Sequence, residues 1–321
     1  MISMKWKKLG KIFDPTNFQL PNGCTEFAQS PQALVFDDFV RIYFSTRKRE
    51  TNSNKYLSYV SFADFDKKFQ KILQTCDHTI IELGELGCFD EHGIFPFSPV
   101  RIGDKIIAYT CGWSRRVSVS VETSIGLAVS EDNGMTFKKL GNGPVLTASL
   151  NEPFLINDAF VRMFDGIFHC WYSYGVRWIR HSMDDEPDRV YKIGHATSGD
   201  GISWKKEGRH IIDDVLNADE CQALPSVIFL NDKYHMFFTY RYAIDFRKNP
   251  RRGYRIGYAY SSDLQDWTRI NDYEGLDMSS SGWDSEMMCY PHVFILENDV
   301  YLLYNGNEFG KYGFGLAVLE W

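Results

Sequence analysis

Hydrophobic and polar positions alternate in short runs along this chain, and one run returns in nearly the same form. Its fullest copies begin Ile-Gly-x-Ala and close with Ser-x-Asp. The copies lie at residues 125–132, 193–200, 256–263 and, shortened, 314–318. Successive glycines of this phrase are 68, 63 and 58 residues apart. A repeat of this length with no helical periodicity between copies is typical of a β-propeller assembled from similar sheets.

A second pattern precedes each copy: an apolar run, a turn centred on Gly or Asp, and an aromatic-rich run. It occurs at residues 33–44, 99–109, 160–172, 227–238 and 293–304. Each reads as a hairpin, because turn pairs such as Asp165-Gly166 and Asn231-Asp232 supply the positive φ that a tight turn needs. Five hairpins predict five blades.

The Ile-Gly-x-Ala phrase then supplies the third strand of a blade, and a fourth strand ends at an aromatic residue such as Trp204 or Trp267. The last copy stops at Trp321 without an outer strand, so residues 5–9 are predicted to supply it and close the ring. We therefore predict an all-β fold, a single five-bladed propeller of four-stranded antiparallel blades over residues 1–321.

Composition bounds the function without identifying it. The 321 residues are 44% hydrophobic and 16% aromatic, enough for one large core, and the net charge of -7 argues against a general nucleic-acid binder. The N-terminus lacks the apolar segment of a secretory signal and no run could span a membrane, so we predict a cytoplasmic protein. Seven scattered cysteines without Cys-x-x-Cys spacing predict reduced thiols. The oligomeric state stays open.

Several phrases carry a resemblance to a known group. They are Ser30-Pro31-Gln32 and residues 41–47, 89–96, 112–115 and 283–291. With the blade pattern, they resemble the five-bladed propeller superfamily of glycoside hydrolase families 32, 43, 62, 68 and 130. The chain looks most like uncharacterised bacterial relatives encoded beside surface-polysaccharide genes. The resemblance implies an active site at one mouth of the central channel, built from acids on the innermost strands.

Acidic residues precede the hairpin of every blade. They are Glu26, then Asp90 and Glu91, then Glu152 and Asp158, then Asp219 and Glu220, and finally Asp284 and Glu286. Converging carboxylates suit glycosidic chemistry, in which one protonates the leaving oxygen and another activates water or attacks carbon. Our predicted catalytic set is Asp90, Glu91, Asp158, Glu220 and Glu286, with Glu152 an equal candidate for the third-blade acid. The alternative is that these acids cap turns.

The resemblance is incomplete at these acids. Asp219-Glu220-Cys221 resembles the Glu-Cys pair that carries the general acid in family 32, but it falls in the fourth blade rather than the third. The Asn-Asp-Pro-Asn phrase of that family is absent, and residues 27–31 have no aspartate where family 43 carries its base.

Basic and aromatic residues leave several hairpins on the same side of the ring. Together with His92 and Asp284, they form the predicted substrate-binding set: Arg47, Trp113, Arg115, Arg177 and Arg241. A rim of Trp and Arg suits a sugar that stacks on aromatic rings while guanidinium groups hold a phosphate or carboxylate. The ligand would then be a carbohydrate or nucleotide sugar. Alternatively, the arginines balance neighbouring acids.

We predict no cofactor and no metal ligands, since His92 is favoured as a hydrogen-bonded channel histidine. Some propellers of this superfamily hold a calcium ion in the channel, so a channel calcium ion stays an open alternative for this chain. The leading hypothesis is a glycoside hydrolase-like enzyme that cleaves or transfers a glycosidic or sugar-phosphate bond in polysaccharide metabolism. The alternative is a catalytically silent glycan-binding or scaffolding propeller.

Overall fold

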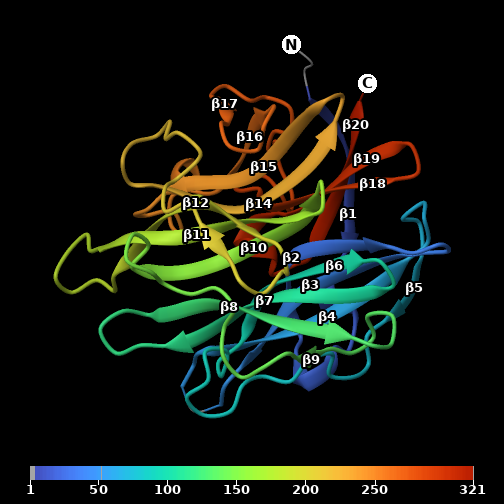
Figure 1. Cartoon of the computed structure of the whole chain (residues 1–321), viewed down its shortest axis with the longest axis horizontal. Helices are drawn as coiled ribbons and strands as arrows, with labels where there is room; N and C mark the ends of the chain where they lie inside the picture. Colours follow the sequence, from blue (N-terminus) through green and yellow to red (C-terminus); the bar gives the residue numbers. More distant parts are fainter. Residues whose placement is uncertain (1–3, 52, 321) are drawn as a thin grey trace.

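The computed structural model describes residues 4–51 and 53–320 and contains five four-stranded antiparallel sheets arranged around a centre (Figure 1). Each sheet is one blade, counted in chain order. The first holds β2 (Glu26–Val35), β3 (Val40–Arg49), β4 (Tyr56–Phe65) and β5 (Ile72–Thr75); the second β6 (Ile94–Ile102), β7 (Lys105–Arg115), β8 (Val121–Ser130) and β9 (Lys138–Lys139). The third holds β10 (Phe154–Phe164), β11 (Ile167–Ile179), β12 (Asp188–Ser198) and β13 (Lys205–Lys206); the fourth β14 (Glu220–Leu230), β15 (Lys233–Tyr242), β16 (Arg255–Ser261) and β17 (Thr268–Ile270). The fifth holds β18 (Cys289–Leu296), β19 (Asp299–Asn305), β20 (Phe314–Glu320) and β1 (Lys5–Phe13).

Short helices lie in the connections. Three are 3₁₀ turns, at Pro15–Asn17, Pro21–Gly23 and Pro250–Arg252, and one is α1 (Asn307–Gly310). Within the described ranges, no helix is both long and apolar enough to cross a bilayer.

The N-terminal strand closes the ring, as the sequence predicted. β1 pairs antiparallel with β20, with Lys5 opposite Glu320 and Trp6 opposite Leu319 (Figure 1). The blade that ends the chain therefore receives its outer strand from the beginning of the chain. β1 covers the edge of β20 and joins the two ends of the chain in one blade, which closes the ring.

The repeated phrase has a packing reason. A Cβ on Gly257 would lie 2.6 Å from the ring of Phe238, and one on Gly126 would lie 2.6 Å from the ring of Phe89, so an aromatic ring covers each glycine. The closing Ser-x-Asp makes the turn into the fourth strand. In the third blade, Asp200 accepts hydrogen bonds from the backbone N–H groups of Ile202 and Ser203 at 2.8 and 2.7 Å. All seven cysteines are free thiols, as predicted.

Each inner strand carries a bulge at the same place. The register against the second strand breaks once or more in every blade, around Ser30, Phe95, Asp158, Leu224 and Tyr290. Four of these five have positive φ, namely 51° at Ser30, 60° at Asp158, 47° at Leu224 and 59° at Tyr290. A bulge bends the strand and turns the side chain to a new direction. We call these five residues the bulge ring.

The bulge ring surrounds the central axis. Inner strands contact one another in the order β2, β6, β10, β14, β18 and back to β2, so the second and fifth blades are not neighbours. The rings of Phe95 and Tyr290 nevertheless meet, with centroids 5.5 Å apart. Further along the strands, Phe160 of the third blade and His292 of the fifth also meet, at 5.9 Å. Side chains therefore fill the channel below its mouth.

Candidate active site

A pocket of 120 Å³ lies at the channel mouth, near the starts of the inner strands. Every blade contributes to it. Its lining is Gln29, Arg47, Phe95, Trp113, Arg189, Arg241, Phe246, Arg247, Tyr254, Tyr290 and Phe309. This set holds four arginines and no aspartate or glutamate from the described ranges. The pocket is therefore a site of positive charge on a protein of net charge -7.

Three of these arginines have no carboxylate partner. Arg247 lies 3.2 Å from Asp188, but within residues 4–51 and 53–320 no acid lies within ion-pair distance of Arg47, Arg189 or Arg241. Arg241 is 2% exposed and donates to the backbone oxygens of Tyr242 and Ala243. Buried cations without counter-charges are costly unless a ligand or the surrounding rings compensate them.

Aromatic rings hold the arginines in place. The guanidinium of Arg241 lies 3.4 Å from the ring centroid of Phe246, and that of Arg189 lies 5.2 Å from the ring of Trp113. Arg47 lies 5.1 Å from the ring of Phe27. Burial lowers the pKa of Arg47, yet a guanidinium remains charged at neutral pH. Cation–π contacts stabilise these groups without neutralising them, so they remain available to an anion.

Asp158 is the single carboxylic acid of the bulge ring. It is 3% exposed, and Asn157 Nδ2 donates to its Oδ2 at 3.1 Å. Burial raises its pKa to about 6, against the opposing influence of Arg189. Asp158 holds the strand position that Phe95 and Tyr290, which line the pocket, hold in their own blades. It is an acid that can carry a proton near neutral pH.

Most of the other predicted acids lie in a repeated structural contact. In four blades, the acid before the inner strand pairs with a basic residue on the outermost strand of the same blade. We call these ion pairs the blade clasps. They are Asp90–Lys139 at 2.5 Å, Glu152–Lys206 at 2.7 Å, Glu220–Arg269 at 2.5 Å and Asp284–Lys8 at 2.7 Å.

The clasps follow from strand register. Each basic residue stands opposite the alanine of the Ile-Gly-x-Ala phrase. In the first blade, the equivalent position opposite Ala63 is Thr75, and no clasp forms. The four clasp acids are at most 2% exposed and none lines the mouth pocket. Their geometry therefore fits a structural role, in contrast to the catalytic role predicted for Asp90 and Glu220 and the substrate contact predicted for Asp284.

The remaining predicted residues lie outside the mouth pocket. Glu91 accepts from the backbone N–H of Gly87 at 2.8 Å and lies 3.2 Å from His92, while Glu286 is exposed. Arg115 pairs with Glu50 at 2.8 Å, and the exposed Arg177 pairs with Asp219. The structure thus gathers Arg47, Trp113 and Arg241 of the predicted substrate-binding set at one pocket. Asp158 of the catalytic set does not line this pocket, but it lies near enough to the lining residue Arg189 for that charge to lower its pKa.

Sequence reasoning missed Arg189 and the tyrosines of the pocket. The search for arginines followed the second strand of each blade, whereas Arg189 is the second residue of a third strand, β12. Tyr290 lies within the phrase at residues 283–291. Its place directly before a proline, like Ser30 and Leu224, was a usable signal for the bulge ring.

The side chains of the channel bear on the calcium ion that the resemblance left open. Across the described ranges, no group of three or more His, Cys, Asp or Glu side chains is placed to hold a metal. His292, buried in the channel, has a pKa lowered by burial and by the neighbouring Arg162 cation. Hard cations require several oxygen ligands, and a cationic arginine opposes them.

Two uncharacterised mycobacterial proteins match nearly the whole of this chain. No family model matches the sequence. The uncharacterised protein Rv1502 of Mycobacterium tuberculosis strain H37Rv is 33% identical over 322 residues, which cover 99% of this chain and 100% of that protein. The uncharacterised protein MT1551 of strain CDC 1551 matches to the same extent.

Solved structures share the architecture at low identity. One described as a glycoside hydrolase has a TM-score of 0.73 at 17% identity, covering 98% of this chain and 92% of that one. The β-1,2-mannobiose phosphorylase from Listeria innocua has a TM-score of 0.72 at 10% identity, covering 98% and 96%. A thermostable family-43 glycoside hydrolase has a TM-score of 0.63 at 14% identity, covering 94% and 91%. The chain therefore belongs to the family of the uncharacterised mycobacterial protein Rv1502, and its fold is that of the five-bladed propeller glycoside hydrolases.

Proposed function

We propose that this protein is a glycoside-active enzyme that binds an anionic sugar at the channel mouth and uses Asp158 as its proton-carrying group. The observation that carries the proposal is the set of three arginines, Arg47, Arg189 and Arg241, that line one pocket without a carboxylate partner in the described ranges. Guanidinium groups recognise phosphate and carboxylate through paired, charge-assisted hydrogen bonds.

The size of the pocket supports an anionic group as its occupant. Its 120 Å³ is well below the about 300–1,000 Å³ of sites that enclose a whole small molecule, so it suits one phosphate or carboxylate group rather than a sugar. The sugar ring itself would lie further out, against Trp113, whose Nε1 is fixed by a 2.6 Å hydrogen bond to the backbone oxygen of Phe95. A fixed indole face is a suitable stacking surface for a sugar.

Asp158 supplies the proton. With a pKa of about 6, about a tenth of Asp158 is protonated at pH 7 and about half at pH 6, so the acid form is present near neutral pH. As the bond between the anomeric carbon and the leaving oxygen breaks, that oxygen takes the proton of Asp158 and an oxygen nucleophile forms the new bond to carbon. The donor is left as a carboxylate, which the neighbouring Arg189 stabilises.

The nucleophile need not be a second carboxylate. Hydrolysis by paired acids uses carboxyl groups on both sides of the scissile bond, and the pocket lining provides no aspartate or glutamate from the described residues. Inorganic phosphate held by the arginines would serve as an oxyanion that has no proton to lose. Water or a sugar acceptor would release its proton to solvent as the new bond forms, and solvent would reprotonate Asp158 after either reaction. The mannobiose phosphorylase that shares this fold makes phosphate a reasonable co-substrate to test.

A silent binding propeller is the second candidate. It is favoured by the blade clasps, which commit four of the predicted acids to structural ion pairs. On this alternative, the mouth would hold the anionic sugar and release it unchanged.

A turnover screen separates the two candidates. Purified protein is incubated with nucleotide sugars, sugar phosphates and short acidic and neutral glycans, with and without inorganic phosphate, and products are identified by mass spectrometry. Asp158→Asn and Arg189→Met are assayed beside it. A new product that is lost in Asp158→Asn supports the enzyme. Tight retention of an anionic sugar without a product favours the binder, and indifference of both binding and turnover to Arg189→Met contradicts the mouth as the site.

A further inference from the structure

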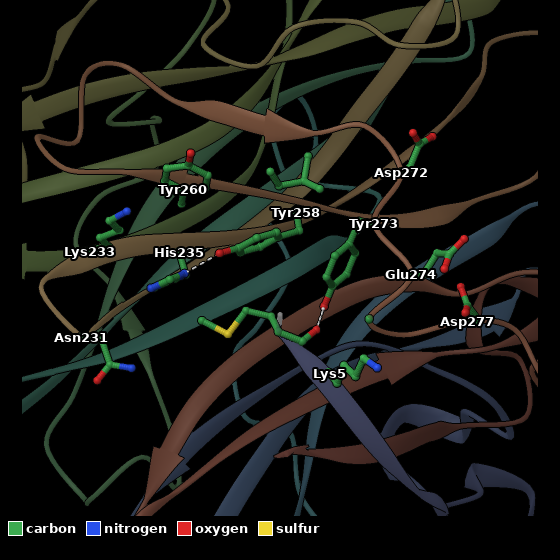
Figure 2. A pocket seen from close by; sticks show the side chains of 13 residues that line it. Lys5, Asn231, Lys233, His235, Tyr258, Tyr260, Asp272, Tyr273, Glu274 and Asp277 are labelled. Carbon is green, nitrogen blue, oxygen red and sulfur yellow. Dashed lines mark hydrogen bonds between the residues drawn. The ribbon is translucent and has the colours of Figure 1, made fainter. Parts of the chain in front are cut away.

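A second cavity, of 470 Å³, opens on the side of the fourth blade, at its junction with β1 (Figure 2). Its residues come from the β14–β15 turn, from β15, β16 and β17, from the connection to the fifth blade, and from the start of β1. The β14–β15 turn lies about 20 Å along β14 from the bulge-ring residue Leu224. This cavity is therefore separate from the channel mouth.

The floor of the cavity is aromatic and fixed. His235 Nε2 lies 3.0 Å from the backbone oxygen of Leu230, so it donates there, and Nδ1 accepts the hydroxyl proton of Tyr258 at 2.7 Å. Burial lowers the pKa of His235, consistent with this neutral form. Tyr273 donates to the backbone oxygen of Met4 at 2.9 Å and accepts from Trp6 Nε1 at 2.7 Å (Figure 2). The hydroxyl groups of Tyr258 and Tyr273 are already hydrogen-bonded within the protein, so mainly their ring faces are available to a ligand.

The rim of the cavity is polar and uncommitted. Asp272, Glu274 and Asp277 stand on one side of the cavity, and Asn231 and Lys233 stand on the other (Figure 2). Among the described residues, none of these five side chains takes part in a hydrogen bond or ion pair of its own. A rigid aromatic floor below free donors and acceptors is the arrangement that suits a sugar, whose CH faces are apolar and whose edges carry hydroxyl groups.

The charges of the cavity favour neither a strongly anionic nor a strongly cationic ligand. The three carboxylates oppose an anion, whereas the mouth pocket attracts one. A cationic amine would compete with Lys5 and with Lys233, whose ammonium group already lies 4.8 Å from the ring centroid of Tyr260. Two lysines and three carboxylates almost balance, which leaves neutral hydroxyl groups as the best-matched partners.

From this geometry we infer that the cavity beside β17 is a second carbohydrate site, one that takes an uncharged mono- or disaccharide unit. Its volume of 470 Å³ lies within the range of small-molecule sites, about 300–1,000 Å³. The inference goes beyond the proposed function and does not rest on it, because the two sites share no residue. A glycan carrying both neutral and acidic units could occupy both sites only if it spanned the side of the fourth blade.

The test is saturation-transfer difference NMR of the full chain with cellobiose, maltotriose, mannobiose and N-acetylchitobiose. Glucosamine and glucuronate serve as charged comparators. We expect at least one uncharged probe to bind with a dissociation constant of about 1 mM and to outcompete both charged ones. Tyr260 of β16 also lines the cavity, with the Lys233 ammonium group near its ring, so it offers a ring face that can be removed without breaking the hydrogen bonds of the floor. Tyr260→Ala should weaken binding of the uncharged probe about tenfold, while Tyr260→Phe, which keeps the ring, should change it by less than about threefold.

A mouth variant separates this inference from the proposed function. Trp113→Ala should leave binding of the uncharged probe unchanged while weakening any anionic ligand of the mouth. The inference is overturned if no uncharged probe binds at about 10 mM, if glucosamine or glucuronate binds better, or if Tyr260→Ala binds as the unaltered protein does. Loss of the uncharged probe in Trp113→Ala would place it at the mouth and would equally overturn the second site.

Discussion

Glu220 and Asp158 are two buried carboxylates at the inner strands of adjacent blades, and their surroundings differ. Glu220 is 0% exposed, lies 2.5 Å from Arg269, and accepts from the backbone N–H groups of Val215 and Leu216 at 2.8 and 2.9 Å. Asp158 is nearly as buried, but no cation among the described residues lies within ion-pair distance of it. The groups that favour its carboxylate at close range are neutral: the Ser173 side chain, the Leu224 backbone and the Asn157 amide, which donates at 3.1 Å. The partners of a buried acid, rather than its burial, distinguish the two.

The same distinction separates the blades from the channel mouth. In the blade clasps, each acid forms an ion pair with a basic residue of the outermost strand, and these ion pairs connect the inner and outer strands. At the mouth, Arg47, Arg189 and Arg241 lack acids within residues 4–51 and 53–320, and the nearby Asp158 has a raised pKa. Unpaired buried charge is unfavourable in a scaffold, and it becomes useful when a ligand completes it.

The strongest test of this contrast is activity. Asp158→Asn removes the transferable proton and should lower turnover of the substrate found in the screen by about 10²–10⁴. Glu286→Gln, which changes an exposed acid away from the pocket, is the matched control and should retain activity. Initial rates at saturating substrate measure the effect. Full activity in Asp158→Asn would remove this residue from the mechanism.

The next test is the stability of a clasp. Glu220→Gln leaves the Arg269 side chain, 3% exposed, buried without its counter-charge, and should cost about 3–5 kcal/mol in the free energy of unfolding. Urea denaturation followed by circular dichroism measures it. The double variant Glu220→Gln/Arg269→Met should recover part of the loss, and Glu286→Gln should stay within about 0.5 kcal/mol of the unaltered protein. If Glu220→Gln were as stable as Glu286→Gln, the structural role of the clasp would be contradicted.

A third test uses the stability of Asp158→Asn, which should increase the free energy of unfolding where Glu220→Gln lowers it. Its pKa rises from 3.8 in the unfolded chain to about 6 in the native protein, so between these pH values the native state binds more protons and stability falls as pH increases. Asparagine imitates the protonated acid and escapes this penalty. Asp158→Asn should therefore match the unaltered protein below about pH 4 and exceed it by about 3 kcal/mol above pH 6. Denaturation at pH 4 and pH 8 checks the prediction, and a destabilised variant at pH 8 would mean that the carboxylate is satisfied.

The fold was largely predictable because a propeller repeats itself. The Ile-Gly-x-Ala phrase predicted the third strands, the hairpin turns predicted five blades, and the missing last strand predicted ring closure by β1. The clasps were not predictable in the same way. Glu220 and Arg269 lie 49 residues apart, and only the strand register brings them together.

The predicted acids divide into two groups by their contacts in the structure. An acid at the start of the inner strand recurs in four of the five blades with a basic partner in each, and a contact that recurs in this way is typical of a structural role in the repeat. Asp158 breaks the pattern, because the equivalent residues are Ser30, Phe95, Leu224 and Tyr290. In a repeat protein, the position where one blade departs from the others is the better indicator of a functional residue.

The smallest expected effect concerns the affinity of the mouth for its anion. Arg189→Met keeps a long apolar side chain against Trp113 but removes the charge, and should weaken binding of the anionic ligand about tenfold. Arg177→Met is the matched control, since Arg177 is exposed, pairs with Asp219 and lies outside the pocket. Calorimetric titration measures both, and added salt should weaken binding less in Arg189→Met because one charge has gone. Equal losses in the two variants would mean that the ligand responds to the overall charge of the face, and the unpaired arginines of the mouth would then have no special part in its recognition.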